Sequence, residues 1–157
     1  MPNPTPAGLR PIRAIATFLL GYIAVTILAI ALSVALEQIT HPPPAKEMVR
    51  SESYVLSEKF YPLINVLVWT ALSWGYFSIR RNSTNLFKEA LSLGSMWLIL
   101  AMLVDYVGFV LIKNPISLGA HDFYIGQFPW IYLIYLAIFV SPLLYVLLRR
   151  KSQAVAA

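Results

Sequence analysis

Four long runs of apolar residues leave few folds open to this chain. The runs cover residues 14–36, 60–79, 90–112 and 128–148, and the only charged residue inside any of them is Asp105. At about 1.5 Å of rise per residue, a helix of about 20 residues crosses a hydrocarbon core about 30 Å thick. Lipid offers no partner to backbone polar groups, and the alternating strand pattern of a membrane barrel is absent. The sequence therefore predicts an all-α integral membrane bundle of four transmembrane helices.

The composition agrees with a membrane protein and fits a single domain over residues 1–157. Hydrophobic residues make up 59% of the chain and charged residues only 12%, so a water-soluble fold of this size would expose large apolar patches. The first run is longer than the 7–15 apolar residues typical of a signal peptide. We therefore expect it to be a retained helix.

The distribution of Lys and Arg predicts the orientation. Eight of the twelve basic residues flank the runs on one side and four on the other; basic residues favour the cytoplasmic side of short loops. This places both termini and loop 80–89 in the cytoplasm, and loops 38–59 and 113–127 outside the cytoplasmic (inner) membrane. The eight are Arg10, Arg13, Arg80, Arg81, Lys88, Arg149, Arg150 and Lys151.

The sequence also predicts local features of the outer loops and of the contacts between helices. Apolar residues among the charges of residues 46–59 predict a short helix lying on the headgroups. Small residues predict close helix contacts, and Pro142 predicts a kink in the last helix. The small residues are Thr17, Gly21, Gly94, Ala101 and Gly108.

Asp105 is the strongest candidate for a residue with a chemical role. A carboxyl group inside a span is costly, so we expect it to face the other helices and to have a partner. Asn65, Tyr132 and Tyr135 lie at similar depth and are the candidate partners. Two interpretations remain open: a hydrogen bond that fixes helix packing, or a proton, cation or ligand site.

The outer loops contain His41, His121 and Asp122. Histidine beside an acid occurs in metal and acid–base sites, but these two histidines lack ligand spacing. With no cysteine in the chain, thiol chemistry is excluded as well. The sequence predicts no catalytic set, no metal site and no cofactor.

Aromatic residues gather around the start of the fourth run. They fit an interfacial belt together with core packing, and the alternative is a pocket for a lipid or planar ligand. The residues are Phe123, Tyr124, Phe128, Trp130, Tyr132 and Tyr135.

The segment from Glu89 to Trp97, with Asp105-Tyr106, Asp122-Phe123-Tyr124, Pro129-Trp130 and Pro142, resembles uncharacterised small four-helix bacterial membrane proteins. The resemblance covers the third and fourth runs only. It implies the four-span fold and brings no activity with it.

These observations predict a non-enzymatic membrane component, either a subunit of a larger complex or a lipid-contacting scaffold. An alternative is a small oligomeric transporter or channel that uses Asp105 as a proton or cation site. A second alternative is a membrane-embedded enzyme acting on a lipid. The expected partners are membrane lipids and either other membrane subunits or further copies of the chain. The basic residues form no stripe interleaved with exposed aromatics, so nucleic acid is not an expected partner.

Overall fold

The computed structural model describes residues 9–41, 51–78, 85–113 and 117–155, with side chains as far as residue 152. Within these residues every regular element is helical, which confirms the all-α class. The elements are α1 (Pro11–Thr40), α2 (Glu52–Glu58), α3 (Tyr61–Phe77), α4 (Leu86–Asp105), the π-helix η2 (Tyr106–Leu111), α5 (Ala120–Tyr124) and α6 (Trp130–Val155).

Three helical segments are long and apolar enough to cross a membrane. They are α1, the continuous segment Leu86–Leu111 formed by α4 and η2, and Trp130–Ser152 of α6. The expected span over residues 60–79 corresponds to α3, whose 17 residues make it shorter than these three. The described residues thus establish three candidate spans rather than four.

Local sequence explains where several helices begin and end. Pro11 occupies the first turn of α1, where its missing N–H breaks no hydrogen bond. The helix ends where His41 takes a left-handed conformation (φ 45°) and donates its backbone N–H to Glu37 O at 3.0 Å. The Ser51 hydroxyl caps α2 by accepting from the Tyr54 N–H at 3.2 Å, which satisfies one of the free donors at the helix start.

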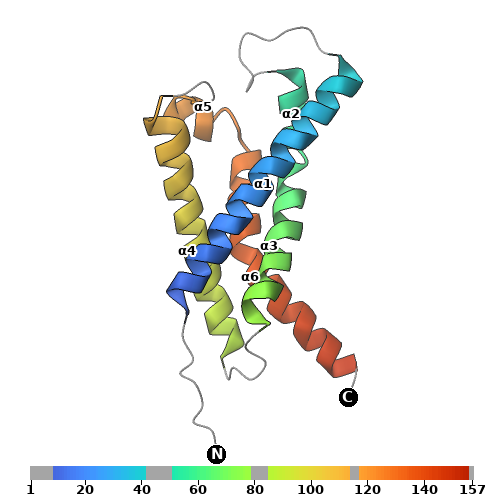
Figure 1. The fold of residues 1–157 in the computed structure, drawn as a ribbon, viewed down its shortest axis with the longest axis vertical. Helices are drawn as coiled ribbons and strands as arrows, with labels where there is room; N and C mark the ends of the chain where they lie inside the picture. Colours follow the sequence, from blue (N-terminus) through green and yellow to red (C-terminus); the bar gives the residue numbers. More distant parts are fainter. Residues whose placement is uncertain (1–8, 42–50, 79–84, 114–116, 156–157) are drawn as a thin grey trace, which may run out of the picture.

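The long helices run alongside one another, and α1 crosses the others at an angle (Figure 1). Helix α6 packs against both α3 and α4, and α1 packs against α2, α3 and α4. The start of α1 and the end of α6 lie at one end of the molecule, while α2 and α5 lie at the other (Figure 1). We call the end that carries α2 and α5 the acidic end, because Glu37, Glu52, Glu58 and Asp122 all belong to it.

Large aromatic side chains form the centre of the bundle. The Trp69 ring lies between Phe18 and Trp97, with centroid distances of 5.7 and 5.0 Å. The Trp97 indole N–H donates to the Ala14 carbonyl oxygen at 2.9 Å. This stack joins α1, α3 and α4, and the buried indole N–H groups of Trp97 and Trp69 both have partners.

Glycine permits the close approach of α4 to α6. A Cβ atom on Gly94 would lie 2.2 Å from the backbone oxygen of Phe139, whereas one on Gly108 would have nothing within 4 Å. Gly21 likewise lies against the Trp69 ring. Gly21 and Gly94 are therefore contact residues, and the expectation for Gly108 was wrong because open space surrounds its Cβ position.

Candidate functional site

Asp105, the last residue of α4, joins three helices. Its Oδ1 accepts a hydrogen bond from the Tyr22 hydroxyl of α1 at 2.5 Å. Its Oδ2 accepts one from the Tyr135 hydroxyl of α6 at 2.8 Å. The side chain is only 8% exposed, so both carboxylate oxygens are satisfied inside the protein.

The backbone changes its helical form directly after this acid. Residues Tyr106–Leu111 form a π-helix, in which the Ile112 N–H reaches back five residues to Val107 O at 3.0 Å. Short π-helical segments are rare and occur frequently at functional sites. Phe109 of this segment lines the same cavity as Asp105.

Of the three expected partners of Asp105, one forms a hydrogen bond with it and two do not. Tyr135 contacts it, but Tyr132, three residues earlier, is 45% exposed and makes no such bond. Asn65 is buried yet bonds within its own helix, donating to Tyr61 O at 2.8 Å and accepting from the Trp69 indole N–H at 2.9 Å. The amide reaches partners one turn away on either side and therefore does not extend to α4.

Helix α2 is held over the acidic end by hydroxyl groups from three elements. The oxygens of Ser33 on α1, Ser57 on α2 and Tyr61 on α3 lie 2.7–2.9 Å from one another. The Gln127 amide donates to the Tyr54 hydroxyl at 3.3 Å and ties α2 to the segment before α6. Helix α2 is thus attached on both sides.

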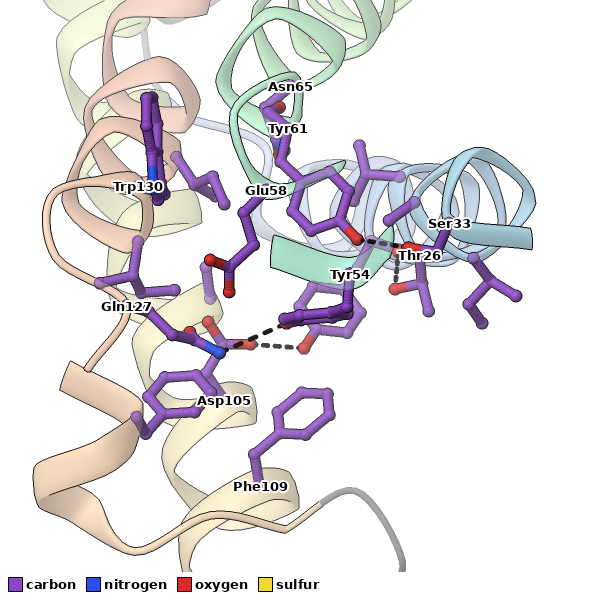
Figure 2. A pocket seen from close by; sticks show the side chains of 18 of the residues that line it. Thr26, Ser33, Tyr54, Glu58, Tyr61, Asn65, Asp105, Phe109, Gln127 and Trp130 are labelled. Carbon is purple, nitrogen blue, oxygen red and sulfur yellow. Dashed lines mark hydrogen bonds between the residues drawn. The ribbon is translucent and has the colours of Figure 1, made fainter. Parts of the chain in front are cut away.

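Beneath α2 lies a cavity of about 310 Å³, bounded by α1, α3, α4, η2 and α6. Its wall is mainly apolar and aromatic, and its acidic residues are Glu37, Glu58 and Asp105. Among the described residues that line it there is no Lys, Arg or His. Figure 2 shows the Glu58 side chain reaching into the cavity between Trp130 and Tyr54.

Glu58 is the second buried acid of the site, at 8% exposure. Burial raises the pKa of its carboxyl group from 4.5 to about 7, and a hydrogen bond from Tyr54 offsets part of that effect. Burial also raises the pKa of the Tyr54 hydroxyl above its usual range. A carboxyl group with such a pKa takes up a proton readily or is stabilised in its charged form by a cation.

The histidine candidates lie away from the cavity. The His121 and Asp122 side chains are 81% and 51% exposed, with His121 Nδ1 and Asp122 Oδ1 3.6 Å apart. His41 is exposed at the end of α1. Among the residues that the structure describes, no three His, Asp or Glu side chains are grouped to hold a metal ion.

The aromatic run divides between cavity and surface. Phe123 and Trp130 line the cavity, and Tyr135 reaches Asp105. In contrast, the Phe128 and Tyr132 side chains are 68% and 45% exposed. Both interpretations of these aromatics, pocket and belt, therefore have residues that fit them.

Sequence reasoning missed Tyr22, Tyr54 and Glu58. For α2 a signal was present, because Tyr54 and Glu58 follow the i, i+4 spacing of one helix face. For Tyr22 no signal existed, since its 83-residue separation from Asp105 is closed only by the crossing of α1 over α4.

Comparisons with models of known protein families, with curated proteins and with solved structures give no significant match to this chain. The resemblance carried by residues 89–142 gains no support from them.

Proposed function

We propose that the chain is a four-span protein of the cytoplasmic membrane, with α3 as the fourth span. Its 17 residues correspond to about 25 Å of helix, close to the thickness of a hydrocarbon core. Packing of α3 against α1 and α6, two of the candidate spans, supports this assignment.

The termini face the cytoplasm in this proposal. The starts of α1 and α4 and the last part of α6 lie opposite α2 and α5 (Figure 1). By sequence these segments carry Arg10, Arg13, Lys88 and Arg149, as the positive-inside rule requires of a cytoplasmic side. The acidic end then faces outward.

In this membrane the chain acts as a non-enzymatic, lipid-contacting component that holds a small amphipathic molecule at its outer end. The observation that carries this proposal is the cavity of about 310 Å³ with its apolar wall and few polar groups. Ligand sites combine such a wall with a small number of placed polar groups. The broad apolar face of α1, which includes Leu20, Ile23 and Ile27, meets lipid or another membrane subunit.

The test is to identify what occupies the cavity. Protein purified in nanodiscs is examined by native mass spectrometry for a retained small molecule, alongside Ala29→Phe, which places a ring at the cavity wall. Ala31→Phe is the matched control, because Ala31 is exposed on the same helix and does not line the cavity. We expect the adduct in the wild type and in Ala31→Phe and its loss in Ala29→Phe; equal adducts in all three would contradict the proposal.

A second candidate is a small oligomeric transporter in which Asp105 carries a proton or cation. The observation that favours it is the placement of one carboxyl group between hydroxyls of two different helices, where a change of charge would alter both contacts. Infrared difference spectra of the wild type and Asp105→Asn test it. A carboxyl signal that titrates between about pH 5 and 8, tracks flux and disappears in the variant would support transport; its absence would exclude it.

A further inference from the structure

Resting on the proposed ligand-binding function, we infer that the cavity binds an amphipathic organic cation. Its ammonium group lies beside Glu58 and Asp105, and its apolar part lies among the aromatic side chains. Three carboxyl-bearing side chains line the cavity, and no described lining residue is basic. An anionic headgroup, such as a phosphate or carboxylate, would meet repulsion here and no cationic donor.

The two buried acids argue for a cation rather than a neutral ligand. Glu58 is 8% exposed and reaches into the cavity between Trp130 and Tyr54 (Figure 2). A buried carboxylate is costly unless it is paired, and no salt bridge to Glu58 exists within the described residues. Asp105 has one hydroxyl donor on each oxygen, and a carboxylate accepts about four hydrogen bonds, so it retains capacity for a cation.

The wall fits the rest of such a molecule. Trp130, Tyr54, Phe109 and Phe123 line the cavity, and aromatic faces attract ammonium groups, most strongly where water is excluded. The volume of about 310 Å³ lies at the lower end of the range for small-molecule sites. The ligand class is therefore an amine or quaternary ammonium compound with one modest apolar group.

The test uses tritiated benzyltrimethylammonium and the wild-type protein in phosphatidylcholine nanodiscs, with empty nanodiscs as the blank. Unlabelled neopentylbenzene competes, because carbon replaces nitrogen in it and only the charge differs. Phenylmethanesulfonate supplies the anionic comparison. We expect saturable binding of the cation, competition at least about tenfold weaker from the neutral compound, and none from the anion.

Variants locate the binding. Glu58→Gln and Asp105→Asn should each weaken binding of benzyltrimethylammonium by about tenfold or more. Glu52→Gln should leave it unchanged, since Glu52 lies on the same helix, is exposed and does not line the cavity. Glu58→Asp keeps the charge and should bind better than Glu58→Gln, which separates the loss of charge from a loss of folding.

Two results would overturn the inference. One is equal competition by neopentylbenzene, and the other is cation binding that survives in both Glu58→Gln and Asp105→Asn. The first of these results would reject a cation while leaving a ligand cavity in place. The mass-spectrometric adduct and its loss in Ala29→Phe do not depend on the ligand's charge, so failure of the proposed function would be recognised separately.

Discussion

Asp105 connects α1, α4 and α6 through its two carboxylate oxygens, so its substitutions separate polar contact from charge. Asparagine keeps one acceptor and one donor at the same place. Leucine keeps neither and leaves the Tyr22 and Tyr135 hydroxyls without partners. Hydrogen bonds between membrane helices average about 0.6 kcal/mol and reach about 1.7 kcal/mol.

We therefore expect Asp105→Leu to lower the free energy of unfolding by about 1–3 kcal/mol and Asp105→Asn to change it little. Unfolding in mixed detergent micelles, followed by circular dichroism, measures both. Equal stability of Asp105→Leu and the wild type would show that these bonds contribute nothing net.

Glu58 predicts a pH dependence of stability. Its pKa is about 7 in the folded protein against 4.5 without burial, so between these values the folded state binds more protons than the unfolded state. Stability then falls as pH rises from about 4.5 to about 7 and levels off above. The titratable side chains that share the cavity with Glu58 are Tyr22, Glu37, Tyr54, Tyr61 and Asp105.

The measurement is the free energy of unfolding of the wild type and Glu58→Gln from pH 5 to pH 8. The variant should lose the decline between pH 5 and 7 because glutamine does not titrate. Parallel curves for the two proteins would assign the decline to other groups.

At the scale of elements, Gly94 and Gly108 give a matched pair on one continuous helical segment. A Cβ at Gly94 would meet the Phe139 backbone oxygen, and one at Gly108 would meet nothing. Overpacking costs about 1–3 kcal/mol, so Gly94→Ala should destabilise by at least that much because backbone must move. Gly108→Ala should be neutral or mildly stabilising.

Thermal unfolding in detergent measures both variants. The prediction is that Gly94→Ala unfolds at a lower temperature than Gly108→Ala. A Gly94→Ala protein as stable as Gly108→Ala would contradict the close contact of Gly94 with the Phe139 backbone oxygen.

Helix α2 supplies a second prediction at this scale. Its attachment through Ser57, Tyr61 and Gln127 should protect backbone amides at residues 55–58. Hydrogen exchange in nanodiscs should be slower there than in the same segment as a free peptide. Exchange at the peptide rate would show that α2 is not held over the cavity. Residues 46–50 of the expected surface helix lie outside the described residues.

The sequence predicted the elements far better than their contacts. Apolar runs at 14–36 and 90–112 located Pro11–Thr40 and Leu86–Leu111 to within four residues at each end, because burial in lipid requires such runs. The choice between Tyr132 and Tyr135 was not predictable, since it depends on how α6 is rotated. Tyr22 required the crossing angle of α1, which no local pattern encodes.

At the scale of the whole molecule, the orientation is open to direct test. Reporter fusions after Leu36 and Ile112 should report the external side, and fusions after Ile79 and at the C-terminus the cytoplasmic side. The reason is the concentration of Lys and Arg at one end. A cytoplasmic signal from the fusion after Leu36 would reverse the topology and place the cavity inside the cell.

The one-sided attachment of α1 has a consequence for how this protein tolerates change. Its buried residues are Ala14, Phe18 and Gly21, and Tyr22 and Ser33 supply its contacts to Asp105 and α2. Substitutions on this narrow seam alter the bundle or the cavity. At the outward positions of this helix, apolar side chains of almost any shape serve equally well. The sequence of the outward face can therefore change to suit whichever lipid or subunit it contacts, whereas the sequence of the seam cannot.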